Sequence, residues 1–168
     1  MMKKCLFLSM LSLFGFIGSA VAAAPQVLGE YGDWIAYYYR DSSGPVCYMA
    51  STPKMDEGKY TKRGDIYVVV THRPKEKSYN VVNINAGYTY KAASETVLKI
   101  GAQTFNMFTN GDKAWAFNEK DDKAIVDAMK RGSRMIVNGT SSKGTKTKDT
   151  YSLNGFSSAY KAISSKCK

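Results

Sequence analysis

The strongest constraint on the fold is a succession of short runs of β-branched and aromatic residues, separated by clusters of turn-forming residues. Residues 66–71, Ile-Tyr-Val-Val-Val-Thr, lack the spacing of an amphipathic helix and predict a buried strand. The aromatic-rich residues 34–39 and residues 46–49 flank Asp41-Ser42-Ser43-Gly44-Pro45, which favours a turn. These two runs are therefore predicted to pair as a hairpin.

Further strands are predicted along the chain, and one hairpin has a strong turn signal. Asn110-Gly111 lies between residues 103–109 and residues 113–117, and both turn residues accept the positive φ of a type I′ turn. The other β-prone runs are residues 79–84, 96–100, 135–137 and 150–153.

Two segments have helical spacing. Residues 121–131 place acids in the first turn and bases in the last, and Gly132 follows as a glycine C-cap. Residues 156–164 place apolar side chains at i, i+3, i+4 and i+7. Together with about nine short strands, these helices predict a mainly β fold, an antiparallel β-sandwich with two short peripheral helices.

The N-terminus has the pattern of a secretory signal peptide over residues 1–22. Two lysines precede an apolar run, and small residues then lead to a cleavage point between Ala22 and Ala23. The apolar run is shorter than the roughly 20 residues that span a bilayer, so a membrane anchor is disfavoured. We therefore expect a periplasmic or secreted protein in which residues 23–168 form a single β-sandwich domain, with no transmembrane segment after processing.

The chain remains cationic after this cleavage. Loss of Lys3 and Lys4 reduces the net charge from +10 to +8, because all the acidic residues lie further along. Such a charge attracts polyanions, among them lipopolysaccharide and acidic glycans, although solubility alone also explains it. Nucleic acid is not an expected partner in the compartment that the signal peptide indicates.

Several lysines lie together in residues 138–149, a connection rich in Gly, Ser and Thr. It is not a phosphate-binding loop, because no Lys-Ser/Thr pair directly follows its second glycine. The connection is predicted to be a basic hairpin tip. Candidate contacts for an anionic partner are Lys143, Lys146 and Lys148, and solvated loop charges are the alternative interpretation.

Two cysteines, Cys47 and Cys167, follow the signal peptide. In an exported protein this even count predicts one disulfide. It would close a loop of about 120 residues, for which the chain-entropy model gives at most about 4–5 kcal/mol. The alternatives are two buried thiols, or a metal site that includes His72. Because the paired ligand spacing of structural zinc sites is absent, no metal ligand is predicted.

The sequence has few features of an enzyme. It contains no Gly-x-Ser-x-Gly elbow, His-Glu-x-x-His motif or Rossmann fingerprint, and it has one histidine. We therefore predict a protein without enzymatic activity or cofactor, with a hydrolase whose acids meet on folding as an alternative. Arg63-Gly64-Asp65 matches an integrin-binding tripeptide, but its position beside a strand favours a strand-entry turn.

The order of several short motifs resembles the invasion-associated locus B family of exported bacterial proteins. No single motif is decisive, but their order and the closing Leu-x-Gly-Phe helix are fairly specific. The resemblance covers essentially the whole chain after the signal peptide and is carried by Tyr31-Gly32-Asp33-Trp34, Val46-Cys47-Tyr48, Ile100-Gly101, Phe105, Ala114-Trp115-Ala116, Ala128-Met129-Lys130, Val137-Asn138-Gly139-Thr140-Ser141 and Tyr151-Ser152-Leu153-Asn154-Gly155-Phe156-Ser157-Ser158-Ala159.

The resemblance implies a periplasmic or surface-associated protein of a Gram-negative bacterium with a role in host-cell invasion, and it implies no enzymatic activity. Better-known members often carry a cysteine soon after the Gly-Asp-Trp motif and others in mid-chain. This sequence resembles a cysteine-poor branch. We expect a non-enzymatic binding protein implicated in invasion or virulence, whose partner is a host-cell surface. The alternative is a housekeeping envelope factor that binds lipopolysaccharide or another anionic polymer.

Overall fold

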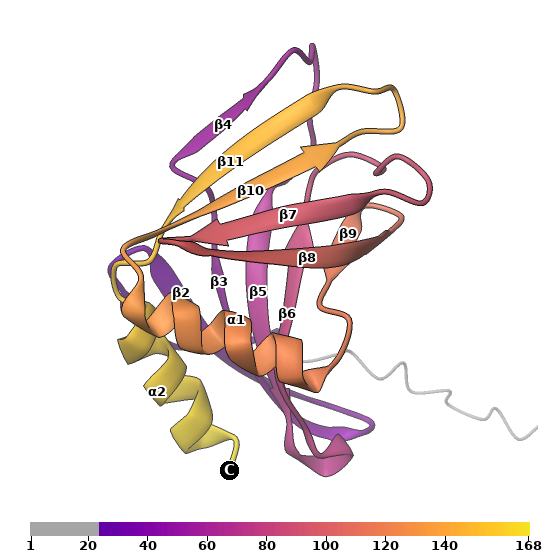
Figure 1. Cartoon of the computed structure of the whole chain (residues 1–168). Coiled ribbons are helices and arrows are strands. Elements are labelled where there is room, and N and C mark those ends of the chain that lie inside the picture. Colours follow the sequence, from indigo (N-terminus) through magenta and orange to yellow (C-terminus); the bar gives the residue numbers. More distant parts are fainter. Residues whose placement is uncertain (1–23) are drawn as a thin grey trace, which may run out of the picture.

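The computed structural model describes residues 24–168, so the predicted signal peptide lies outside the described residues. The strands form one antiparallel sheet that curls into two facing layers, with two helices at its margin (Figure 1). The mainly β prediction is confirmed. The elements are β1 (Gln26–Tyr31), β2 (Trp34–Asp41), β3 (Gly44–Ser51), β4 (Met55–Gly58), β5 (Tyr67–Arg73), β6 (Ser78–Asn85), β7 (Glu95–Ile100), β8 (Gln103–Asn110), β9 (Lys113–Trp115), α1 (Glu119–Arg131), β10 (Arg134–Thr140), β11 (Lys146–Ser152) and α2 (Phe156–Lys166).

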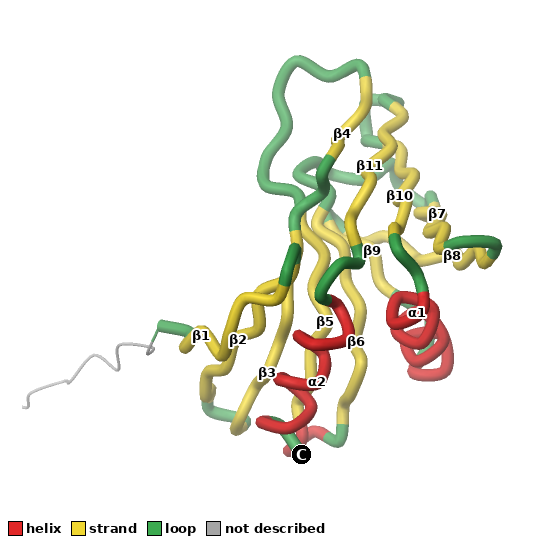
Figure 2. Tube along the Cα trace, turned by 90° about the vertical axis from the view of Figure 1, so that its left-hand side faces the viewer, coloured by secondary structure: helices red, strands yellow, loops and turns green. Residues whose placement is uncertain are grey.

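The order of strands explains how one sheet makes two layers. Its eleven strands run β1-β2-β3-β5-β6-β9-β8-β7-β10-β11-β4. Strands β2, β3, β5 and β6 form one layer, and β7, β8, β10 and β11 cross in front of its upper half (Figures 1 and 2). Short β9 joins the layers by pairing with both β6 and β8. Among residues 24–168, no helix is both long and apolar enough to cross a bilayer.

The core fills the space between the layers and beneath the helices. Helix α1 packs against β6, and α2 packs against β1, β2 and β3. The Trp34 ring meets the Phe156 ring of α2 edge-to-face, with centroids 4.9 Å apart. The largest fully buried apolar side chains include Trp34, Met49, Ile84, Leu98, Met107, Ile125, Met129, Met135, Tyr151, Phe156 and Ile163.

Two strands, β1 and β4, were not predicted from the sequence. Both lie at edges of the sheet, where one side of the strand has no partner. Every residue of β4 is exposed. An edge strand with both faces exposed to solvent needs no alternation of apolar and polar residues, so its sequence does not show the pattern that predicts a strand.

The predicted hairpin between β8 and β9 forms, but its turn is displaced by one residue. Asn110 pairs with Lys113 at the end of the ladder, so Gly111 and Asp112 form the loop. Of these two residues, Gly111 alone has positive φ, at 61°. A single positive φ at the first loop position is the requirement of a type II′ turn, so the predicted type I′ turn is wrong.

Helix α1 begins at Glu119, two residues earlier than predicted, because Asn118 caps it. The Asn118 side chain accepts a hydrogen bond of 3.0 Å from the Asp121 N–H. Gly132 follows the helix with an extended φ of −84°, so a left-handed glycine cap is absent. The glycine serves close packing instead, since a Cβ there would lie 2.6 Å from Ile100 Cγ2.

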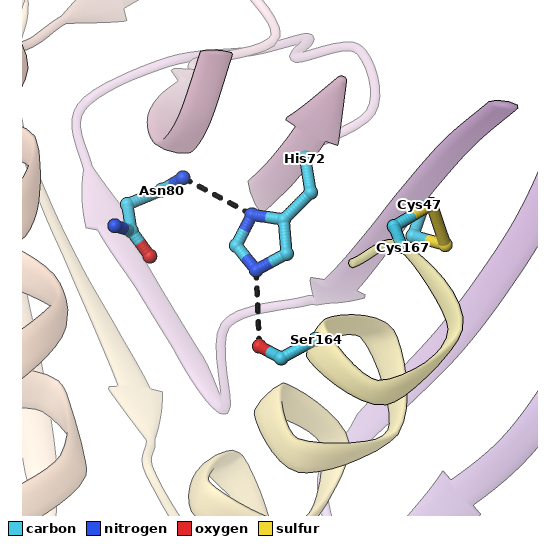
Figure 3. The surroundings of a disulfide bond; sticks show 5 residues. All are labelled: Cys47, His72, Asn80, Ser164 and Cys167. Atoms are coloured by element: carbon cyan, nitrogen blue, oxygen red, sulfur yellow. Dashed lines mark hydrogen bonds between the residues drawn. A yellow bond between two sulfur atoms is a disulfide. The ribbon is translucent and has the colours of Figure 1, made fainter. Parts of the chain in front are cut away.

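A disulfide joins Cys47 on β3 to Cys167 directly after α2, with Cα atoms 5.9 Å apart. His72 lies opposite Cys47 in the β3–β5 ladder and is 2% exposed (Figure 3). The Asn80 N–H donates to His72 Nδ1 over 3.1 Å, and His72 Nε2 lies 3.1 Å from Ser164 Oγ on α2. Because Nδ1 accepts, the neutral ring carries its proton on Nε2 and donates it to Ser164.

His72 makes stability depend on pH. Burial lowers its pKa, and the positive charge of Lys130 lowers it further. The folded state therefore keeps the ring neutral, whereas the unfolded chain takes up a proton below the ordinary pKa of 6.5. The contribution is present above that pH and is lost as pH falls below it.

We therefore expect the free energy of unfolding of the native protein to fall more steeply than that of H72Q between about pH 7.5 and 5.5. Urea unfolding at several pH values measures it. Burial also raises the pKa of Asp122 to about 6, and this opposite contribution is common to both proteins. Parallel pH profiles for the two proteins would contradict the assignment.

Gly155, at the start of α2, has a φ of +87°, and a Cβ there would lie 1.8 Å from the Tyr31 carbonyl oxygen. Gly101 has a similar φ of +57° but no atom within 4 Å of such a Cβ. We expect G101A to cost about 1–2 kcal/mol through left-handed strain alone, and G155A to cost more than about 4 kcal/mol. Urea unfolding of both variants tests this, and equal losses would show that the contact with Tyr31 is unimportant.

Candidate functional site

Three connections meet at the upper end of the curled sheet (Figure 1), and their side chains line a cleft. They are the β4–β5 connection, the segment after β6 and the β10–β11 turn. We call it the basic cleft, and its volume is about 370 Å³. Its lining residues are Lys59, Tyr60, Thr61, Lys62, Arg63, Tyr88, Thr89, Ser141, Ser142, Lys143, Thr145 and Thr147.

The floor of the basic cleft is a buried ion pair between Arg63 and Asp149 of β11. Two guanidinium nitrogens donate to the two carboxylate oxygens, each over 2.6 Å, and Arg63 Nε donates to the Ala86 carbonyl over 2.7 Å. The two side chains are 3% and 2% exposed. Burial disfavours the charged guanidinium, but the hydrogen bonds and charge of Asp149 outweigh burial and raise the pKa of Arg63.

Aromatic rings cover Arg63 on two sides. The guanidinium lies 5.4 Å from the centroid of the Tyr60 ring and 5.0 Å from that of Tyr88, within the range of cation–π contacts. The Tyr88 hydroxyl is 2.6 Å from Thr147 Oγ1. A Cβ at Gly139 would lie 2.5 Å from that hydroxyl oxygen, so a glycine on β10 gives Tyr88 its space.

The walls are tied together by backbone hydrogen bonds. The Gly64 N–H donates to the Gly87 carbonyl over 2.9 Å, and the Ser142 N–H donates to the Thr89 carbonyl over 2.8 Å. Gly87 has a φ of +68°, and a Cβ there would lie 2.5 Å from the Gly64 carbonyl oxygen. The three connections are therefore held against one another, and the cleft is preformed.

The rim of the basic cleft carries positive charge. The side chains of Lys59, Lys62 and Lys143 are exposed. Among the ion pairs of residues 24–168, none includes these lysines or Lys146. An adjoining hollow is lined by Lys59, Lys143, Lys146 and their neighbours, so the positive surface continues beyond the cleft.

The three lysines predicted from the sequence have different surroundings. Lys143 lines the basic cleft and Lys146 lines the adjoining hollow. Lys148 lies apart from both and pairs with Glu57 of β4 over 2.8 Å. The sequence did not single out Lys59 and Lys62, although their clustering with Arg63 in one connection was a usable signal.

The integrin-type tripeptide does not present its arginine. The Arg63 side chain is buried in its pair with Asp149, and the Asp65 carbonyl accepts a hydrogen bond from Asn85 Nδ2 over 2.7 Å. The tripeptide therefore serves the strand-entry turn. Its glycine makes the close contact with Gly87.

The cleft offers cations and hydroxyl groups. Among the described residues that line it, none is His, Cys, Asp or Glu. The neighbouring carboxylate, Asp149, is bonded to Arg63 through both of its oxygens and does not line the cleft. Within residues 24–168, no group of three His, Cys, Asp or Glu side chains is placed to hold a metal ion. This chemistry suits the binding of an anion that also forms hydrogen bonds.

Removing one partner of the buried pair leaves an uncompensated charge. We expect R63M to lower the free energy of unfolding by about 3–5 kcal/mol, and R63M/D149L to regain most of that loss. Urea unfolding of both variants and the native protein measures these values. A double variant no more stable than R63M would mean that the floor is held by packing and not by charge compensation.

Comparisons with known proteins agree with this architecture. The crystal structure of invasion associated protein B from Bartonella henselae is similar to this chain, with a TM-score of 0.56 and 17% sequence identity. The alignment covers 85% of this chain and 96% of that one, and at this identity it shows a shared fold. No curated protein sequence matches the chain significantly.

A family model described as invasion associated locus B (IalB) protein matches residues 34–164. The matched region begins at the first residue of β2 and ends within α2, so it includes both layers of the sheet and both helices. Because the match spans most of the sequence, this chain belongs to the invasion associated locus B family.

Proposed function

We propose that this protein is an exported, non-enzymatic binding protein that contributes to host-cell invasion by holding an anionic polymer through the basic cleft. The observation that carries the proposal is the group of exposed lysines, Lys59, Lys62 and Lys143, without acidic partners over a preformed floor. Membership of the invasion associated locus B family supports the role in invasion. The signal-peptide pattern of residues 1–22 supports a periplasmic or surface location.

The position of the charges favours a polymer over a small anion. The lysines lie on the rim, where water screens each of them, so one contact contributes little. A ligand gains affinity by meeting several lysines together, and the hollow that includes Lys146 extends the positive surface. A chain with repeated negative groups fits this arrangement.

The same geometry supports a binding role over hydrolysis. A hydrolase that uses two acids needs both carboxylates facing the substrate. At the basic cleft, Asp149 lies beneath Arg63 with both carboxylate oxygens bonded to the guanidinium. It has no free oxygen with which to act as a general base on a ligand.

The proposal is tested with two triple variants of equal net charge. K59A/K62A/K143A removes the rim lysines, and K99A/K120A/K161A removes three exposed lysines from β7, α1 and α2. We expect the rim variant to bind purified lipopolysaccharide and heparin about 10–100-fold more weakly at physiological salt, and the control variant to lose less than about threefold. Surface plasmon resonance measures both affinities.

The biological readout uses the same variants in an infection assay. A strain that lacks the protein is complemented with the native, rim-variant or control gene, and intracellular bacteria are counted. We expect the native and control genes to restore invasion and the rim variant not to. Equal loss of binding in both triple variants would indicate nonspecific attraction. Undiminished invasion by the deletion strain would favour a housekeeping envelope role.

A further inference from the structure

The basic cleft continues into two further hollows. The first shares Tyr88 and Thr89 with the basic cleft and reaches Tyr67, and its volume is about 360 Å³. Asp65 and Asp112 also line it, and Asp112 pairs with Lys113, so neutral sugars suit this stretch better than charged ones. The second begins at Tyr67 and extends over the outer face of β2, β3 and β5, with a volume of about 490 Å³. We call this second hollow the tyrosine groove. It is lined mainly by Tyr37, Tyr39, Tyr48, Tyr67, Val69 and Thr71.

Strand alternation explains why tyrosines gather on this face. Ala36 on β2 and Met49 on β3 point into the core, so their neighbours along each strand point outward. Tyr37 pairs with Tyr48 across the ladder, and the two rings stack at 12° with centroids 4.8 Å apart. Tyr39 meets Tyr48 edge-to-face, with ring centroids 6.0 Å apart. These rings support one another and are ordered before a ligand arrives.

The tyrosine groove has no uncompensated charge. Among the described residues that line it, Arg73 alone is charged, and it donates to Asp41 over 2.8 Å and lies 3.6 Å from Glu76. The other lining residues are four tyrosines, three small apolar residues and Thr71. Tyrosine rings have apolar faces and one polar hydroxyl group, so they suit a ligand that also has apolar faces and polar edges. Sugar rings have apolar C–H faces and hydroxyl groups around their edges.

The two ends of this path therefore have different chemistry. Lysines line the basic cleft and can bind negatively charged groups of a ligand. Tyrosines line the tyrosine groove, which offers a negatively charged group no unpaired cation. A nucleic acid carries a phosphate at every nucleotide and would place charges over the uncharged groove. Polyphosphate would do the same, without any ring to stack.

We infer that the ligand is an acidic oligosaccharide whose charged groups lie in the basic cleft while its neutral sugars stack on the tyrosine groove. This inference rests on the proposed function and adds the class of polymer to it. The lysines supply attraction that salt weakens, and the tyrosines supply contacts that salt does not. A ligand that used only the lysines, or only the tyrosines, would not need the hollow that connects the basic cleft to the tyrosine groove.

The test compares probes that share charge or sugar but not both. The octasaccharide probe carries two uronic acids at one end followed by six neutral glucose units, maltooctaose is a neutral chain of the same length, and a short polyphosphate carries charge alone. We expect the octasaccharide to bind at least about tenfold more tightly than polyphosphate or maltooctaose. Isothermal titration calorimetry measures the three affinities.

Variants locate the two contributions. Y37V/Y48V removes the stacked rings and replaces them with β-branched side chains that favour strands. It should weaken binding of the octasaccharide about tenfold and leave the affinity for polyphosphate unchanged. K59A/K62A/K143A should weaken both charged probes. Unchanged polyphosphate affinity in Y37V/Y48V also shows that this variant is folded.

The failures can be told apart. Equal affinity for the octasaccharide and polyphosphate, unaffected by Y37V/Y48V, would overturn the oligosaccharide assignment and leave the anion-binding cleft intact. Tighter binding of a single-stranded oligonucleotide than of the octasaccharide would also overturn it. Failure of every charged probe to bind would overturn the proposed function together with this inference.

Discussion

The basic cleft depends on one interaction, the buried pair of Arg63 and Asp149. The β4–β5 connection has little regular structure of its own, and Arg63 fixes it to β11 and to the Ala86 carbonyl. Burying two charges costs several kcal/mol per ion, which close geometry and complete hydrogen bonding offset. Each Arg63 nitrogen donates one hydrogen bond of 2.6–2.7 Å, and both carboxylate oxygens of Asp149 accept one, so the geometry of the pair is close. The main effect of the pair is to position the β4–β5 connection, so that Lys59 and Lys62 line the same cleft as Lys143.

The opposite end of the molecule is fixed by α2. The disulfide from Cys47 to Cys167 and the hydrogen bond between His72 and Ser164 bind the C-terminal part of this helix to β3 and β5 (Figure 3). Because α2 covers the core face of these strands, their alternate side chains are left on the outer face. The tyrosine groove is therefore a direct consequence of how the helix closes the core.

Local pattern predicted most of the strands and both helices, because β-branched runs, turn residues and helical spacing are properties of neighbouring residues. It did not predict β4, whose pairing with β11 sets Glu57 opposite Lys148. That register is why Lys148 is neutralised while Lys143, only five positions earlier, is not. Local pattern did not predict the cleft either, because contacts between distant segments form it. Its walls come from residues 59–63, 88–89 and 141–147, which the curl of the sheet brings together.

Several acidic residues form ion pairs away from the cleft rim. Asp33, Asp41, Glu57, Asp112, Asp127 and Asp149 all pair with lysine or arginine outside the cleft rim. At physiological salt an uncompensated lysine acts over about 8 Å, so the rim attracts and orients a polyanion without holding it firmly. Aromatic contacts act only at close range and are not screened. A ligand with charge alone would exchange quickly at this surface, and one that also reaches the tyrosines would stay bound because its dissociation must break both kinds of contact.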